Sequence, residues 1–532
     1  MGKRVAIVGS GCSGVAALWA LDTSTDHQVH LFEAESRLGG HTNTVRFEAP
    51  SADGGGAPGT PVDVDTGFIV MNSATYPNFV RFLDQVGVST RRTEMTFGVS
   101  RDQGGFEWAG TSLGSVFAQT KNVFSPGMWR MIFDIVRFNE FALDLLQAES
   151  EADDDDEASE DENQYTDEVR TATKTTKTKQ VAAAQESIGD YLDRENYSRE
   201  FRDDYLIPMT AAVWSTSPDK CSLEFPAVTL VRFMYNHHLL STVAKRPDWM
   251  TIPGGSRRYL DAVLRGFDRS RIHVKSKVTA VRPLDGRVVL TTNGRDHEFD
   301  HVILATHGDQ ALEILKSAAT EEEAGILSGF QTSRNVAVLH SDLALMPKRR
   351  IAWSAWNYIT ESPFPPTNSQ NVSKVCLTYW MNLLQHIPED EYGPVLVTLN
   401  PLNMPEPRLT QGIWEYSHPL YNATAIRSQK LLPRIQNTRN ISYCGAWTKY
   451  GFHEDGFSSG LSVAVDHLGA RLPFDFVDST FSRGSRPALT WKNYVSRSLI
   501  LSVQIAMLLV GNACTALAAM LDRRIASRRK TA

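Results

Sequence analysis

Three glycines near the start of the chain have the spacing of a turn that binds a diphosphate. Gly9, Gly11 and Gly14 follow the apolar run 4–8, which is typical of a buried parallel strand. The first glycine permits a tight turn, the second lets backbone N–H groups approach the phosphates, and the third lets the next helix, expected over 15–21, pack closely on the strand. The positive end of that helix attracts the diphosphate. The spacing therefore predicts a dinucleotide-binding turn.

An acidic residue stands where the ribose of such a nucleotide needs a hydrogen-bond acceptor. Residues 29–33 are typical of a second strand and end in Glu33, about 20 residues after the glycines. A carboxylate here accepts hydrogen bonds from ribose hydroxyls and repels a 2′-phosphate, which makes NADP the poorest candidate. These two motifs leave NAD and FAD as the candidate cofactors.

The next motif favours FAD. Arg37-Leu-Gly-Gly40 follows the acidic residue closely, and this R-x-G-G element resembles the flavoprotein superfamily of amine oxidases and carotenoid-type desaturases. In that superfamily the arginine and the glycines lie along the FAD diphosphate and the flavin. The resemblance therefore implies FAD as the cofactor, with Arg37, Gly39 and Gly40 as contacts.

A second glycine-containing stretch lies far along the chain. A short apolar strand reaches Gly445, and Gly456 and Gly460 then have the G-x-x-x-G spacing at the start of an apolar helix. Free N–H groups at the start of a helix can hydrogen-bond a flavin carbonyl and stabilise negative charge on reduced flavin. The resembled superfamily uses a G-A-x-x-S-G helix for this purpose, and Phe457 stands here where alanine is usual. We expect this loop and the first turn to meet around one cofactor.

The loop itself resembles a narrower group. The sequence Y-G-F-H-E-D-G over 450–456 is similar to predicted NAD/FAD-binding proteins often associated with cyclopropane-fatty-acid synthases, and this resemblance covers residues 3–470. The loop has no cysteine that could carry flavin covalently in the amine oxidase manner, so we expect noncovalent FAD. His453, Glu454 and Asp455 form a polar cluster that we expect beside the flavin. Within it, His453 is the candidate proton shuttle, and Asp455 is expected to cap the helix.

The motifs and the resemblance together define the expected site. By resemblance, the backbone of Val278 contacts the adenine, and His453 is the one catalytic candidate. The 14 histidines show no metal-binding spacing, so we expect no metal. The expected cofactor contacts are Gly9, Gly11, Cys12, Ser13, Gly14, Glu33, Ala34, Arg37, Gly39, Gly40, His41, Thr42, Val278, Gly445, Asp455, Gly456 and Phe457.

Composition limits the class of protein and its partners. The 532 residues, 42% of them hydrophobic, are enough for two or more intertwined domains with large cores. The net charge of −7 provides no basic footprint for nucleic acid, so we expect a small-molecule partner instead. The five cysteines have no C-x-x-C spacing, and the first strand begins so early that we expect no signal peptide before it. We therefore expect a reduced, cytosol-facing catalytic part.

The order of the motifs predicts an α/β fold. We expect a discontinuous Rossmann-like FAD-binding domain, an α+β substrate domain of the amine oxidase type, and a C-terminal hydrophobic helix. A dense acidic run followed by a Thr/Lys tract predicts a disordered insertion within the substrate domain. The expected boundaries are 1–75, 250–310 and 435–475 for the FAD-binding domain, 76–249 and 311–434 for the substrate domain, 149–180 for the insertion, and 491–532 for the helix and its basic tail.

The C-terminal segment is a candidate membrane anchor. Residues 498–521 contain no charged residue, and a helix of this length reaches roughly 36 Å, enough to cross a hydrocarbon core of about 30 Å. An interfacial helix, or one that docks on the protein, is the alternative. If the segment spans a bilayer, we expect the large domain to face the cytosol; the segment does not indicate which membrane.

These observations favour an FAD-dependent oxidoreductase that transfers hydride from an apolar substrate, possibly a lipid or fatty-acyl chain, to the flavin. An amine oxidase that produces hydrogen peroxide is one alternative. A non-redox FAD-binding protein, or an isomerase, is another. The sequence leaves the substrate, the electron acceptor, the catalytic acid or base and the oligomeric state open.

Overall fold

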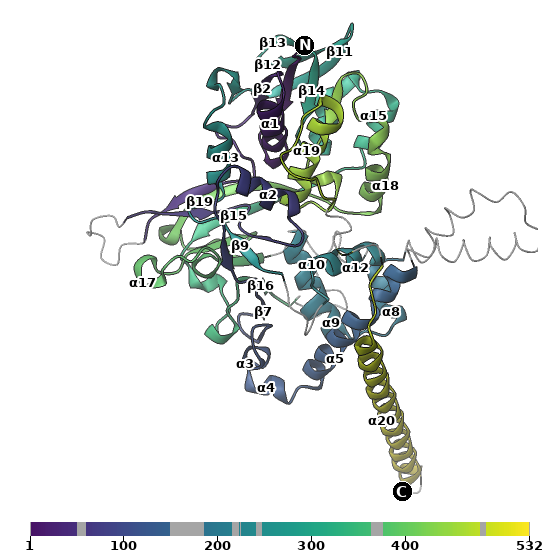
Figure 1. The fold of residues 1–532 in the computed structure, drawn as a ribbon. Helices are drawn as coiled ribbons and strands as arrows, with labels where there is room; N and C mark the ends of the chain where they lie inside the picture. Colours follow the sequence, from purple (N-terminus) through teal and green to yellow (C-terminus); the bar gives the residue numbers. More distant parts are fainter. Residues whose placement is uncertain are drawn as a thin grey trace, which may run out of the picture.

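The computed structural model of the protein describes residues 2–49, 60–148, 186–214, 223, 225–240, 247–362, 376–478, 483 and 486–530. The acidic insertion expected over 149–180 lies outside the described residues. The chain folds into an upper part, which contains both ends of the predicted cofactor site, and a lower part built on a larger sheet (Figure 1).

A parallel five-stranded sheet forms the centre of the upper part. Its strands come from three separate stretches of chain, and all neighbouring strands run parallel. Apolar side chains are buried on both faces, as is usual for parallel sheets covered on both sides. The order is β10 (Ile272–His273), β2 (Gln28–Phe32), β1 (Arg4–Val8), β14 (His301–Leu304) and β20 (Ile441–Tyr443).

Different layers cover the two faces of this sheet. One face packs against helices α1 (Cys12–Ser24), α2 (Pro77–Gln85), α13 (Arg257–Leu264) and α19 (His453–Leu468). The other face packs against α14 (Gly308–Leu315), α15 (Glu321–Leu327), α18 (Ala423–Leu431) and a three-stranded antiparallel sheet of β11 (Val278–Leu284), β12 (Arg287–Thr292) and β13 (Arg295–Phe299). We propose that the three expected segments, 1–75, 250–310 and 435–475, form one FAD-binding domain. Helices α2, α14, α15 and α18 pack on this domain.

A seven-stranded sheet forms the floor of the lower part. Its strand pairs are antiparallel except for β16 and β7, which run parallel. The order is β19 (Thr410–Pro419), β15 (Thr332–His340), β18 (Leu396–Leu399), β17 (Cys376–Trp380), β16 (Trp356–Thr360), β7 (Phe97–Arg101) and β8 (Phe106–Ala109). Short strands form two further small sheets. In one, β3 (Thr44–Phe47) pairs with β4 (Val62–Asp65); in the other, β9 (Trp249–Thr251) lies between β5 (Met71–Asn72) and β6 (Arg91–Thr93).

Helices pack beside this sheet and make a separate aromatic core. A π-helical turn, Arg202–Leu206, joins two of them, and its Trp108 neighbour donates an indole hydrogen bond to the Asp204 carbonyl at 3.0 Å. The helices of this core are α5 (Pro126–Phe141), α8 (Ile188–Arg194), α9 (Arg199–Phe201), α10 (Ile207–Trp214) and α12 (Ala227–Asn236). Two short helices lie outside it: α3 (Leu113–Val116) contacts β8, and α4 (Thr120–Val123) contacts α5.

The C-terminal helix α20 (Trp491–Lys530) projects away from the rest of the molecule (Figure 1). It contains the one helix stretch among the described residues that is long and apolar enough to cross a membrane, Trp491–Val510, with a mean hydropathy of 1.4. The helix begins several residues before the expected span, because its first turns dock on α5. There Arg497 forms an ion pair with Asp144 at 2.7 Å and lies over the Phe141 ring.

Candidate active site

The glycine turn between β1 and α1 has the geometry that a diphosphate requires. Gly9 has a φ of +103°, and a Cβ there would lie 2.5 Å from the Ala305 carbonyl oxygen. A Cβ on Gly14 would lie 2.0 Å from the Gly9 carbonyl oxygen, so a side chain would push α1 off the turn. Gly11 differs, because a Cβ there meets nothing within 4 Å. The space beside Gly11, at the N-terminus of α1, is open to a ligand.

Ser10, which the sequence reasoning missed, joins the parts of the nucleotide site. Its N–H donates to Glu33 Oε2 at 3.0 Å, and its hydroxyl also donates to that oxygen. The Gly39 N–H in turn donates to Ser10 Oγ at 3.0 Å. Ser10 therefore holds the predicted ribose acceptor and the R-x-G-G motif in one arrangement. Its place inside the glycine motif was the one available signal.

Two glycines of α19 bring the distant loop against the first turn. A Cβ on Gly456 would lie 2.6 Å from Cys12 Sγ, and a Cβ on Gly460 would lie 2.0 Å from the Ser13 carbonyl oxygen. Helix α1 and helix α19 can approach this closely because glycine has no side chain. The two motifs, far apart in the sequence, thus lie in contact.

Helix α19 begins earlier than expected. It starts at His453 rather than Gly456, and the Gly456 N–H donates to the Phe452 carbonyl at 3.0 Å, so it is not free for a ligand. Asp455 Oδ2 accepts the Phe452 N–H at 2.9 Å, which confirms a capping role but places it in the third helical position. The N–H groups without intrahelical partners are therefore those of 453–455.

Phe457 contacts the core rather than the cavity. Its ring packs against Phe79 and Phe82, with ring centroids 5.2 and 4.6 Å away. The side chain is fully buried, so only its backbone is available to a cofactor. The alanine expected by resemblance is thus replaced by a residue that fills space between α19 and α2.

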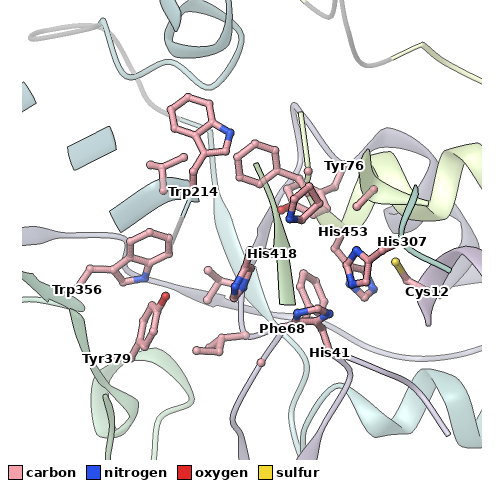
Figure 2. Close-up of a pocket in the computed structure, with 18 residues that line it drawn as sticks. Cys12, His41, Phe68, Tyr76, Trp214, His307, Trp356, Tyr379, His418 and His453 are labelled. Atoms are coloured by element: carbon pink, nitrogen blue, oxygen red, sulfur yellow. The ribbon is translucent and has the colours of Figure 1, made fainter. Parts of the chain in front are cut away.

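A cavity of about 200 Å³ extends from the glycine turn to the seven-stranded sheet. Figure 2 shows Cys12 and His453 at one end, Trp356 and Tyr379 at the other, and His418 between them. Aromatic and aliphatic side chains dominate the lining, and none of the described lining residues is Asp, Glu, Lys or Arg. The lining is Cys12, His41, Gly67, Phe68, Ile69, Val70, Tyr76, Val213, Trp214, His307, Trp356, Tyr379, His418, Pro419, Ala446, Gly451, Phe452 and His453.

The predicted proton shuttle His453 lies among aromatic rings. It stacks on Phe68 with ring centroids 3.8 Å apart, and its Nε2 is 3.1 Å from the Tyr259 hydroxyl. Tyr259 also hydrogen-bonds the Thr42 hydroxyl, so a chain of polar groups leads from the imidazole to the R-x-G-G segment. Burial lowers the pKa of His453 to about 3, which keeps the ring neutral.

Three further histidines, whose cooperation the sequence reasoning missed, line the same cavity. The His41 ring lies 5.1 Å from the His418 ring and 6.4 Å from the His307 ring. Burial lowers the pKa of all three, with that of His418 at about 4, and neighbouring histidines lower the pKa of His41 and His418 further. Asn335 donates to His418 Nδ1 at 2.8 Å, which leaves Nε2 as the protonated nitrogen of that neutral ring. No sequence motif marks this group, because its members come from three separate segments.

Comparison with known proteins identifies the family. Residues 12–468 match the family model described as flavin containing amine oxidoreductase. The chain belongs to this family. It is accordingly an FAD-dependent oxidoreductase, as the R-x-G-G resemblance implied. No curated protein matches the sequence.

Solved structures of the same fold cover nearly the whole chain at low sequence identity. A CLA-producing fatty acid isomerase from P. acnes has 13% identity and a TM-score of 0.57, over 87% of this chain and 98% of that one. Cyclohexylamine oxidase from Brevibacterium oxydans IH-35A has 14% identity and a TM-score of 0.55, over 88% and 98%. Reduced UDP-galactopyranose mutase has 14% identity and a TM-score of 0.54, over 91% and 98%. These likenesses confirm the α/β flavoprotein fold.

The residues of the nucleotide end fit FAD. Arg37 Nη1 and His41 Nε2 are buried and have no hydrogen-bond partner within the described part of the chain. A buried donor without a partner costs about 1–3 kcal/mol, which acceptor atoms of a bound cofactor remove. The open space at Gly11 and the start of α1 suits a diphosphate. We therefore propose Arg37 and His41 as FAD contacts.

We propose that the other predicted contacts adjoin the adenosine or the flavin. Ser276 donates its N–H to the Glu33 carbonyl at 2.8 Å, which brings the start of β11 beside the ribose acceptor. Val278 is buried two residues later, in the position proposed for adenine contact. Ala34 is exposed next to Glu33. Gly445 begins the crossing to the flavin loop, and its N–H donates to Ser459 Oγ at 2.9 Å.

Glu454, the middle residue of the predicted polar cluster, has a structural role. Its carboxylate accepts the Asn78 and Phe79 N–H groups at 3.0 and 2.9 Å, and also the Asn78 side-chain amide and the Ser458 hydroxyl at 2.9 Å. It thereby caps α2 from a neighbouring helix. Burial raises the pKa of Glu454 to about 7. The cluster thus divides into one cavity residue, His453, and two capping carboxylates.

Proposed function

We propose that this FAD-dependent oxidoreductase acts on an apolar, lipid-like substrate, with a fatty-acyl chain as the favoured class. The observation that carries the proposal is the cavity without formal charge: its histidines are kept neutral by burial, and its described lining includes no Asp, Glu, Lys or Arg. A permanently charged substrate would lose its hydration there without a compensating partner. An apolar chain loses nothing of that kind.

The proposed reaction removes a hydride and a proton from adjacent carbons of the substrate. FAD, when bound, supplies the hydride acceptor, and oxygen or another acceptor takes the electrons afterwards. The chain supplies position and exclusion of water: Trp214, Trp356 and Phe452 enclose the cavity. The first N–H groups of α19 stabilise negative charge at the cofactor end.

His453 remains our candidate for handling the substrate proton. Its neutral imidazole can accept a proton, and the Tyr259 and Thr42 hydroxyls provide hydrogen-bonded neighbours toward the cofactor contacts. The low pKa makes the charged form short-lived, so the proton must be passed on. We therefore propose that His453 passes the substrate proton on to a neighbouring group and does not retain it.

Three features support a lipid substrate. One structural neighbour is named as a fatty acid isomerase. The Y-G-F-H-E-D-G loop resembles proteins associated with cyclopropane-fatty-acid synthases, which act on acyl chains. Helix α20 presents an apolar surface long enough to span a bilayer, and we propose that it anchors the cytosol-facing enzyme in a membrane.

Anaerobic addition of substrates to the purified flavoprotein tests the proposal. Fatty acids and phospholipids should bleach the flavin absorbance near ~450 nm, because reduction of the cofactor removes that band. Alkyl amines serve as the matched comparison. Bleaching by amines alone, with peroxide formed on readmission of air, would replace the proposal with an amine oxidase, which the neighbouring cyclohexylamine oxidase structure makes the second candidate.

An isomerase gives a third pattern in the same experiment. Acyl chains would then be converted with the double bond moved and with no net flavin reduction. The named function of the P. acnes neighbour motivates this comparison. Product analysis by mass spectrometry separates the two acyl outcomes, because desaturation removes two hydrogens and isomerisation removes none.

A further inference from the structure

Large apolar side chains are exposed at one edge of the molecule, away from the cavity. Leu113 and Phe124 are each 82% exposed, Trp129 is 52% exposed, and Ile351 is 53% exposed. We call these four residues the apolar rim. They belong to α3, the end of α4, the first turn of α5, and the adjacent segment Arg350–Ala352. Single exposed apolar residues are ordinary, but a group of this size on one edge marks a contact surface.

The rim is a built surface. The Phe117 and Trp129 rings lie 5.2 Å apart, which ties α3 to α5. Trp129 donates its indole N–H to the Val123 carbonyl at 2.8 Å, so the polar end of the side chain is satisfied while the ring faces outward. A Cβ on Gly114 would lie 3.4 Å from Ile351 Cδ1, which places Ile351 against α3.

Helix α5 fixes the rim relative to α20. One end of α5 carries Trp129, and the other end holds the start of α20. Asn493 donates to Glu140 Oε2 at 3.2 Å, and Arg497 pairs with Asp144 at 2.7 Å. The 16 residues of α5 span roughly 24 Å. Figure 1 shows α3 and α4 at the end of the molecule from which α20 projects, level with its first turns.

The surface of α20 beyond this docking point has the same character. Apart from the buried Ile500, its large apolar side chains between 499 and 510 are 38–65% exposed. Exposed lysines accompany both surfaces: Lys121 is next to Phe124 on α4, and Lys492 lies at the start of α20. Outward aromatic rings with lysines beside them are characteristic of the lipid headgroup region. A water-soluble protein partner bound at the apolar rim would leave the apolar surface of α20 exposed to water.

We propose that the apolar rim inserts into the headgroup region of the same bilayer that α20 enters. This inference rests on the membrane anchoring in the proposed function and adds a second contact, which fixes the orientation of the enzyme. The chain passes from β8 directly into α3, and β8 shares its sheet with β16, whose Trp356 lines the cavity. Insertion of the rim would therefore hold the cavity in one orientation relative to the bilayer.

A fluorescence experiment on the full-length flavoprotein tests the rim. Single cysteines at Phe124→Cys, Ile505→Cys or Leu284→Cys carry an environment-sensitive NBD label, in a chain with Cys221→Ser and Cys514→Ser. Burial raises the pKa of Cys12, Cys376 and Cys444 to about 12, which suppresses their labelling. The protein is placed in phosphatidylcholine vesicles with a minor share of phosphatidylserine, with or without doxyl-labelled lipid.

The three positions separate the rim from the anchor. Leu284 is 51% exposed, is the last residue of β11 and serves as the control. Figure 1 shows β11 at the end of the molecule opposite α20. Quenching at 124 at least roughly twofold above that at 284 is expected for an inserted aromatic position. Equal quenching at positions 124 and 284 would contradict insertion of the apolar rim, whatever the quenching at position 505. Quenching at 505 reports the anchor alone, so the two ideas fail separately.

A second variant guards against a local effect of the label. Leu113→Ser combined with Ile351→Ser leaves position 124 free for labelling and removes two members of the rim. Both residues are exposed, so the flavin content should match that of the unsubstituted chain. Quenching at 124 should fall in this variant if the rim inserts as a unit, and unchanged quenching would contradict that.

Discussion

The two ends of the candidate site are built in opposite ways. The nucleotide end consists of charged and polar groups: Glu33, Arg37 and Ser10, with backbone N–H groups between them. The cavity end consists of aromatic rings and neutral imidazoles. We propose that the polar end binds the charged cofactor and that the cavity end excludes water around an apolar substrate. His41 belongs to both ends, because it lines the cavity and is a proposed FAD contact, so we expect substitutions at the other residues to change FAD affinity and substrate choice separately.

The largest expected effect is at the glycine turn. In Gly14→Ala the new Cβ would lie 2.0 Å from the Gly9 carbonyl oxygen, so the turn must open. We expect at least a roughly 100-fold loss of FAD affinity, because α1 no longer presents its N-terminus to the diphosphate. The ratio of flavin to protein absorbance after purification measures this. Gly325→Ala is the matched control, since a Cβ there meets nothing within 4 Å.

Arg37→Met should give the next largest loss of FAD affinity, and it tests whether the polar end of the site binds FAD. Removing a charge-assisted hydrogen bond to FAD should weaken binding about 10–100-fold, or roughly 1.5–3 kcal/mol. The apoprotein should not lose stability, because Arg37 Nη1 has no partner within the described residues. FAD titration and thermal unfolding of the apoprotein measure the two quantities. A less stable apoprotein with unchanged FAD affinity would assign Arg37 a structural role instead.

The parts of the site that could be predicted are local in the sequence. The glycine turn, Glu33 and the R-x-G-G motif each lie within a short segment whose spacing reports their geometry. The start of α19 was misplaced because Asp455 caps the helix through a backbone contact that composition does not show. The histidine group could not be predicted, because folding alone brings His41 and His418 together.

The same reason explains why the capping role of Glu454 was not predicted. Its partners on α2 lie more than 370 positions earlier in the chain, so nothing near it indicates that it caps another helix. The sequence placed it with His453 and Asp455 as a single polar cluster. Only the packing of α2 against α19 separates the three roles. Long-range polar contacts of this kind are the features that motifs miss.

Glu454→Gln should lower stability by about 1–3 kcal/mol, because the amide presents a donor to one of the α2 N–H groups. The pKa of Glu454 is raised from 4.5 to about 7 in the folded state. The folded protein therefore binds the extra proton, and the contribution of this titration is full below pH 4.5 and is lost as the pH rises through 7. The stability difference between the two proteins should narrow over that range in urea unfolding of the apoprotein. A difference that does not change with pH would contradict the raised pKa.

His453→Phe should have the smallest effect on stability and the opposite pH dependence. Phenylalanine keeps the stacking on Phe68 and loses one hydrogen bond to Tyr259, which costs about 1 kcal/mol. Burial lowers the pKa of His453 from 6.5 to about 3, so its contribution is present above pH 6.5 and is lost as the pH falls toward 3.

The difference in stability between wild type and His453→Phe should therefore shrink in acid, whereas that for Glu454→Gln shrinks as the pH rises. If His453 transfers the substrate proton, flavin reduction in the variant should also slow roughly 10-fold or more, as loss of a general base requires. Tyr259→Phe is the companion variant, because it removes the same hydrogen bond and keeps the imidazole. Equal slowing in both variants would assign the proton route to the pair, and unchanged reduction in His453→Phe would limit His453 to packing in the cavity wall.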